Sequence, residues 1–174
     1  MMRVLLMLTL WLAAALPLAA QPVEDCHDTA PALPSPELMR TLTQWIGAHT
    51  SYDITRSLQT PPSVSFCMTG EIIRYEGRDL LVDPQLRAAY DLSARRIFLV
   101  VPWQADNPTH VSALLHELIH DVQLLNRDWP CIGAPEWEAY SLQEEWLQAR
   151  GIDPGFNWMS IYMWSRCPRD VHPD

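Results

Sequence analysis

With 174 residues, 48% of them hydrophobic and 19% charged, the chain is long enough to bury one core and too apolar to be intrinsically disordered. Its net charge of −9 at pH 7 argues against nucleic acid or anionic lipid as a partner, because an acidic surface repels both. These properties predict a single globular domain.

The first 20 residues have the layout of a secretory signal peptide. Arg3 supplies a positive start, the segment 4–16 is apolar but for one threonine, and Ala20 follows other small residues. The apolar run is short for a membrane span, which favours cleavage over an uncleaved anchor. We expect cleavage near Ala20 and a secreted or periplasmic protein outside the membrane. Cleavage would remove one basic and no acidic residue, which changes the net charge to −10.

Residues 21–34 are polar and contain prolines, so we expect an extended arm that precedes one domain over residues 35–174. Ser35-Pro36-Glu37 is typical of a helix start, with a capping hydroxyl, a proline in the first turn and an acid near the positive end. Apolar residues at helical spacing follow and predict a helix that ends near Thr50.

The segment 60–101 favours strands instead. Val64 and Phe66 alternate with serines, which predicts one strand, and two strand pairs are expected after it, each around a turn. These pairs are Ile72-Ile73 with Leu80 to Val82, and Ala89-Tyr90 with Arg96 to Val101.

Three helices are predicted next, over residues 108–126, 135–150 and part of 154–166. Asn107 and Pro108 are typical of a helix start, and Gly151 suits a C-terminal cap. The order of elements predicts an α+β domain in which a small antiparallel sheet packs against helices.

The four cysteines allow three disulfide pairings. An even count in an exported protein favours two disulfides, and we favour Cys26–Cys67 together with Cys131–Cys167. A thiolate metal site is the alternative, but no CxxC spacing supports it.

The sequence His116-Glu117-Leu118-Ile119-His120 lies in the middle of the helix predicted over 108–126 and matches the pattern H-E-x-x-H. Histidines four apart project from one face of a helix, so the two imidazoles can hold one Zn²⁺ ion. Glu117 is displaced round the helix and can reach a water at that ion as general base. The alternative is a structural pair of histidines beside a surface glutamate.

A catalytic zinc takes three protein ligands and keeps a fourth position for water. The residues after His120 lack the glycine and the third histidine that continue this motif in metzincins, so we expect a carboxylate of the next helix as third ligand. Glu136 and Glu138 are the candidates, and they point in different directions because they are two residues apart. Glu138 could instead complement the helix dipole.

These two segments resemble the gluzincin metallopeptidases, which pair HExxH with a glutamate on a following helix. The resemblance implies a zincin-like fold and a peptide or protein substrate. It also implies Glu136 as third ligand, because the ligand glutamate of several branches precedes an alanine as ExxA, here Ala139. Many gluzincins then carry an aspartate that supports one histidine, where this chain has Tyr140. The segment from Ala89 to Arg150 is also similar to an uncharacterised family of small exported bacterial HExxH proteins.

The chemistry expected of such a site is hydrolysis, with zinc held by His116, His120 and Glu136 and the proton moved by Glu117. Candidate partners that orient the histidines are Asp121, Gln123 and Gln143. Candidate donors to an oxyanion are Tyr140, Tyr162, His110 and Arg166.

In zincins an edge strand often pairs with an extended peptide, and Arg96 to Val101 is the candidate strand here, because it precedes the metal helix. The alternative for this segment is a plain core strand. An exported zinc metallopeptidase is thus the leading hypothesis. The alternatives are a zinc hydrolase of a cell-wall or small-molecule bond and a non-enzymatic binding protein with a zincin-like fold.

Overall fold

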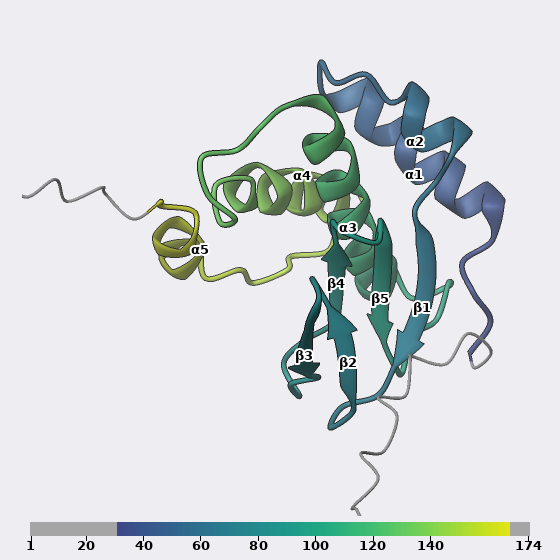
Figure 1. Ribbon diagram of the computed structural model, residues 1–174. Coiled ribbons are helices and arrows are strands. Elements are labelled where there is room, and N and C mark those ends of the chain that lie inside the picture. Colours follow the sequence, from purple (N-terminus) through teal and green to yellow (C-terminus); the bar gives the residue numbers. More distant parts are fainter. Residues whose placement is uncertain (1–30, 168–174) are drawn as a thin grey trace, which may run out of the picture.

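The computed structural model describes residues 31–167, and Figure 1 shows how their helices and strands are arranged. The expected signal peptide and most of the expected arm lie outside the described residues. The elements are, in chain order, α1 (Pro36–His49), α2 (Thr55–Gln59), β1 (Ser63–Cys67), β2 (Ile72–Tyr75), β3 (Arg78–Leu81), β4 (Ala88–Asp91), β5 (Arg96–Val100), α3 (Pro108–Asn126), α4 (Glu136–Gln148) and α5 (Trp158–Trp164).

The main sheet has the strand order β1-β5-β4, and β2 and β3 form a separate antiparallel hairpin. The predicted α+β class is confirmed. The prediction of a purely antiparallel sheet is wrong, because β4 pairs antiparallel with β5 but β1 pairs with β5 in parallel. Parallel neighbours need a long connection, and the hairpin together with β4 supplies it.

The central position of β5 overturns a second expectation. Arg96 to Val100 is paired on both sides, so this strand is not a free edge. Its last four residues are all buried, which is the pattern of a central strand. The edge on the side of α4 and α5 is β4, whereas β1 lies on the side of α1 and α2 (Figure 1).

Side chains of β5 alternate between two apolar clusters, as the period of a strand requires. Ile97 and Leu99 pack into the large core that the sheet shares with α1, α3 and α4. Phe98 and Val100 pack into a smaller cluster with Ile73 of the hairpin. The sheet therefore lies between the helices and the hairpin, and its helical face supports α3.

Helix α3 begins where the sequence predicts. The Asn107 side chain accepts hydrogen bonds from the backbone N–H groups of Thr109 and His110, at 2.9 and 3.3 Å, and Pro108 occupies the first helical position. Most of the helix is buried. Burying one leucine or isoleucine side chain stabilises a fold by about 1.5–3 kcal/mol, and Leu114, Leu115, Leu118 and Ile119 are all at most 1% exposed. The helix that carries the motif is thus held on several sides.

Helix α2 is absent from the sequence prediction. It has five residues and no side-chain cap, so neither periodicity nor a capping residue identifies it. Within residues 31–167, no helix combines the length and the apolar character that crossing a bilayer requires.

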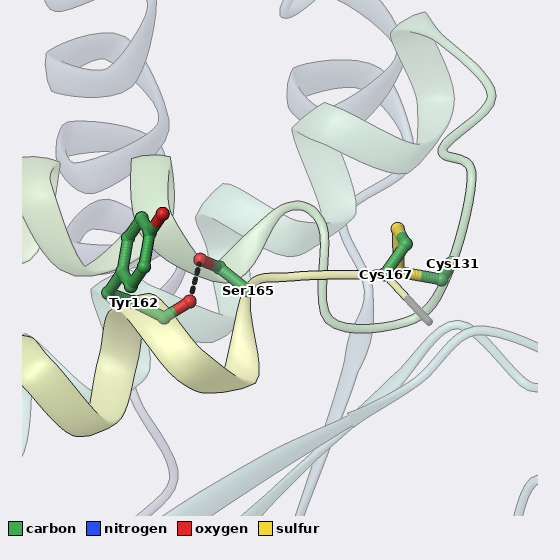
Figure 2. The surroundings of a disulfide bond; sticks show 4 residues. All are labelled: Cys131, Tyr162, Ser165 and Cys167. Carbon is green, nitrogen blue, oxygen red and sulfur yellow. Dashed lines mark hydrogen bonds between the residues drawn. A yellow bond between two sulfur atoms is a disulfide. The ribbon is translucent and has the colours of Figure 1, made fainter. Parts of the chain in front are cut away.

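The predicted disulfide Cys131–Cys167 is confirmed, with an S–S distance of 2.06 Å. Figure 2 shows it joining the loop between α3 and α4 to the segment after α5, where the Ser165 hydroxyl donates to the carbonyl oxygen of Tyr162 at 2.9 Å. The loop approaches α5 so closely that a Cβ at Gly133 would lie 2.2 Å from the Trp164 carbonyl oxygen. Cys67 is a free, buried cysteine, and its expected partner Cys26 lies outside the described residues.

Candidate metal centre

Three donor side chains from two helices converge at one point. His116 and His120 of α3 have their Nε2 atoms 3.0 Å apart. The Glu136 carboxylate, in the first turn of α4, lies 3.3 Å from Nε2 of His116 and 3.4 Å from Nε2 of His120. Both histidines are buried, and Glu136 is partly exposed.

The donor set fits a zinc ion. Ligand atoms about 2.0–2.1 Å from a tetrahedral zinc lie about 3.3–3.4 Å from one another. The Nε2 atoms lie 3.0 Å apart, and each is 3.3–3.4 Å from a different oxygen of Glu136, so that one ligand atom from each residue lies within 4.8 Å of the others. Two imidazole nitrogens and one carboxylate are also the ligand types that zinc takes in catalytic sites, with a further position left open. His116, His120 and Glu136 could therefore hold the ion.

Each histidine contacts one glutamine through its Nδ1 atom. His116 Nδ1 lies 3.0 Å from Oε1 of Gln143, and His120 Nδ1 lies 3.0 Å from Oε1 of Gln123. An amide oxygen accepts, so both Nδ1 atoms donate and both Nε2 atoms are directed at the centre of the site. Of the three candidate partners, Gln123 and Gln143 lie against the histidines. Tyr140 does not take the place of an orienting carboxylate, since its ring lies edge-on against His116 with centroids 4.5 Å apart.

Asp121 belongs to a different cluster. Its carboxylate accepts hydrogen bonds from the hydroxyls of Ser57 and Tyr90, at 2.6 and 2.8 Å, and pairs with the Arg95 guanidinium at 3.0 Å. These partners come from α2, β4 and the turn before β5. Asp121 therefore ties α3 to the sheet, and the expectation that it orients a histidine is wrong.

The two candidate glutamates of α4 contact different residues in the structure. Glu136 faces the histidines, whereas the Glu138 carboxylate is bonded to the Tyr52 hydroxyl and to the Gln123 amide. Among the residues that the structure describes, the group of side chains suited to a metal contains Glu136 and not Glu138.

The electrostatics of the site reflect the closeness of these groups in the metal-free protein. Burial raises the pKa of Glu136, but hydrogen bonds from His116 and His120 outweigh burial and hold that pKa far below its ordinary value. Burial lowers the pKa of His120, but the Glu136 hydrogen bond and the charges of Glu117 and Glu136 raise it overall. The pocket thus favours a carboxylate beside positive charge, which is what a bound cation also provides.

Glu117 lies at the same site without joining the three donors. Burial raises its pKa, against the opposing charges of His116 and His120. It lines a cavity of about 660 Å³ together with the two histidines and Glu136. A second cavity, of about 360 Å³, shares His116, Glu117 and Tyr140 with the first. The motif therefore lines two neighbouring cavities.

Of the four candidate oxyanion donors, only Tyr140 lines these cavities. Burial, followed by the charges of Glu136 and Glu117, raises the pKa of its phenol, so the hydroxyl stays protonated near neutral pH. Arg166 and Tyr162 are exposed and bonded to each other, and His110 Nδ1 accepts a hydrogen bond from the Gln104 backbone N–H.

No sequence pattern indicates Tyr75, which also lines the larger cavity. Its hydroxyl donates to the Tyr90 carbonyl oxygen at 3.1 Å. Burial, with the charge of Glu117 as the next cause, raises the pKa of Tyr75 to about 12. The hairpin brings this residue to the site, and no local pattern could have revealed that contact.

Comparison with known families gives one result. Residues 31–174 match the family model described as "Domain of unknown function (DUF6647)". The chain belongs to this family. The match covers every described helix and strand, including α3 and α4 with the three donor residues. No curated protein and no solved structure matches the chain significantly.

Proposed function

We propose that this protein is an exported zinc-dependent hydrolase with a zincin-like active site, and that its substrate is a peptide or protein. One observation carries the proposal. The two histidines of an H-E-x-x-H motif meet a glutamate of a following helix at donor separations of 3.0 to 3.4 Å, and the motif's own glutamate stands beside them on a cavity.

A zinc ion held by His116, His120 and Glu136 would supply Lewis acidity to a substrate carbonyl and lower the pKa of a water. Glu117 is the general base in this scheme. It takes a proton from the attacking water and later passes it to the leaving amine. Its raised pKa suits both steps, because a base with a pKa nearer the working pH accepts and releases a proton more readily.

Tyr140 is our candidate donor to the developing oxyanion. Its hydroxyl is protonated near neutral pH, its ring packs against His116, and it lines both cavities. A donor that is already in place needs no reorganisation when negative charge develops on the substrate oxygen.

The edge strand β4 supports a peptide substrate. Val100 N–H donates to the Arg87 carbonyl oxygen, and an antiparallel ladder alternates, so the backbone groups of Ala88 and Tyr90 point away from β5. The Tyr90 carbonyl oxygen already accepts from Tyr75. The N–H and C=O groups of Ala88 face the edge where both cavities meet, and an extended peptide could pair with them.

Export is the remaining part of the proposal. It rests on the signal-peptide pattern of residues 1–20 and is consistent with the Cys131–Cys167 disulfide, since such bonds form and persist in oxidising compartments.

The test combines metal analysis with a substrate screen on the purified, exported protein. We expect one zinc per chain and turnover of casein or peptides, with slower or no turnover of peptidoglycan and acyl esters. Glu117→Gln should keep the zinc and lose activity by roughly 10²–10⁴-fold, the usual contribution of a general base. The matched control is Glu145→Gln, the same change at a carboxylate that is exposed on α4, which should leave activity intact.

Four results would count against the proposal. Absence of zinc from the wild-type protein would remove the metal centre, and unchanged activity in Glu117→Gln would remove Glu117 as base. Clear turnover of esters or peptidoglycan with none of peptide bonds would keep the hydrolase and reject the peptidase. Zinc binding without turnover of any substrate would favour a binding protein instead.

A further inference from the structure

The Glu138 side chain lies behind the metal site rather than in it. Its Oε2 atom accepts hydrogen bonds from the Tyr52 hydroxyl at 2.6 Å and from Gln123 Nε2 at 2.8 Å. Arg127 Nη2 lies 3.7 Å from the same oxygen. Glu138 therefore touches His120 only through Gln123, and its role must be sought in what it does to that glutamine.

The orientation of the Gln123 amide decides the protonation of His120. A histidine that binds a metal through Nε2 must carry its proton on Nδ1. The His120 Nδ1–H then needs an acceptor, and Oε1 of Gln123 stands 3.0 Å away. If this amide were reversed, its NH₂ group would face Nδ1 and favour a proton on Nε2, where the metal would have to bind.

Two acceptors hold the amide in the required orientation. Gln123 is completely buried, and its Nε2 donates both to Glu138 Oε2 at 2.8 Å and to the Pro135 carbonyl oxygen at 3.2 Å. A reversed amide would place Oε1 against a carboxylate and a carbonyl oxygen. Two acceptors facing one another in a buried site are strongly unfavourable.

We infer that Glu138 is a positioning residue, which fixes the Gln123 amide and thereby keeps Nδ1 of His120 as the donor to Gln123, so that Nε2 faces the metal site. This inference rests on the proposed function, since it concerns the same metal centre. Tyr52 completes the arrangement. Its phenol stays a donor over the physiological range, because burial and the hydrogen bond to Glu138 raise the pKa of Tyr52 to about 12.

The other histidine provides an internal control. His116 is held by Gln143, whose Nε2 donates to the Ser112 hydroxyl at 3.1 Å. Neither Glu138 nor any other carboxylate is bonded to Gln143 in the part of the chain that the structure describes. A change at Glu138 should therefore alter His120 and leave His116 as it was.

The experiment measures two quantities for the full exported protein. Long-range ¹H–¹⁵N NMR of the metal-free protein gives the tautomer of each histidine, and competition with a chelator gives the zinc affinity. In the wild type we expect a proton on Nδ1 of His120. In Glu138→Ala we expect a substantial fraction of His120 that lacks the Nδ1 proton, an unchanged His116, and a zinc affinity lower by about tenfold, at the low end of the effect of outer partners of metal ligands.

Glu138→Gln separates hydrogen bonding from charge. A glutamine at this position keeps an acceptor oxygen for Gln123 and Tyr52, so it should restore the wild-type tautomer and most of the zinc affinity. Ser112→Ala is the matched change behind the other histidine, and it should alter the signals of His116 alone.

The outcomes are decisive in both directions. Unchanged tautomer and affinity in Glu138→Ala overturn the inference, as does a complete loss of zinc there while Glu136→Ala still binds zinc, because Glu138 would then be a ligand. An Nδ1 atom without a proton on His120 in the wild-type protein overturns it without any variant, should Glu138→Ala fail to fold. If the wild type binds no zinc at all, the proposed function fails, while the tautomers of the metal-free proteins still test Glu138.

Discussion

Two buried polar clusters meet along one helix, and they differ in what completes them. Asp121 is surrounded by donors: the hydroxyls of Ser57 and Tyr90 and the guanidinium of Arg95. One residue earlier, the His120 Nε2 atom lies 3.0 Å from Nε2 of His116 and 3.4 Å from the Glu136 carboxylate. The first cluster is complete with protein groups alone, whereas the second needs a proton or a metal ion between its groups. Burial alone does not distinguish a structural polar cluster from a functional one, whereas a count of donors against acceptors does.

The largest effect should come from the covalent link beside the second cluster. Removing the Cys131–Cys167 bond with Cys131→Ser and Cys167→Ser frees a loop of 36 residues in the unfolded chain and should lower the free energy of unfolding by about 3–4 kcal/mol. Denaturant unfolding measures this loss. Ser165→Ala, next to the bond, is the control and should cost far less. Equal losses in the two proteins would mean that the bond contributes little.

The next largest effect should come from the cluster around Asp121. Asp121→Ala leaves the Arg95 charge without its partner and should lower the free energy of unfolding by about 3 kcal/mol, at the low end of the range for a broken buried pair because the Arg95 side chain remains 21% exposed. Zinc stoichiometry should not change. Loss of zinc in a folded Asp121→Ala protein would show that the two clusters are coupled and break the distinction between them.

The stability of the cluster formed by His116, His120 and Glu136 should depend on metal instead. Zinc at 100 times its dissociation constant should stabilise the wild-type protein by about 2.7 kcal/mol, through binding to the folded state alone. Thermal unfolding with and without zinc measures this increment. In His120→Ala the increment should vanish, and magnesium, which prefers oxygen ligands, should not replace zinc in the wild type. A similar gain in both proteins would place the binding elsewhere.

The smallest effect should be the pH dependence of the metal-free protein. The pKa of His120 is raised by folding, so its contribution to stability is fully present below pH 6.5 and is lost as the pH rises through the folded pKa. The pKa of Glu136 is lowered, so its contribution is present above pH 4.5 and lost on acidification. Metal-free protein should thus be more stable at pH 5.5 than at pH 8. The zinc increment should rise over the same interval, because zinc competes with protons for the histidines. Unfolding curves at both pH values, with and without zinc, measure these free energies. A zinc increment that is the same at pH 5.5 and at pH 8 would contradict the expected competition with protons.

What the sequence could predict was local. Histidines four apart on a helix are neighbours whatever the rest of the fold does, and Asn107 and Pro108 mark the start of that helix without reference to other elements. The helices and strands other than α2 were predicted for the same reason, since each has its own period or cap.

What the sequence could not predict depends on which faces meet. Asp121 and Gln123 flank the same turn of α3, and only the position of the sheet decides that the first reaches Arg95 while the second reaches His120. The parallel pairing of β1 and the central place of β5 likewise follow from strand order, which no local pattern encodes. Tyr75 is brought to the cavity by the β2–β3 hairpin, far before the motif in the sequence. Contacts between residues so distant in the chain produce no periodic pattern in the sequence.

The wall of the larger cavity offers a way to watch the site directly. Trp129 lines this cavity, and the Arg127 guanidinium lies over its indole ring at 3.6 Å from the centroid. A molecule that enters the cavity must change the polarity around this indole or displace the guanidinium from it. Subtracting the emission spectrum of Trp129→Phe from that of the wild type would isolate one fluorophore among eight tryptophans. Occupancy of the cavity could then be followed by light, without any turnover.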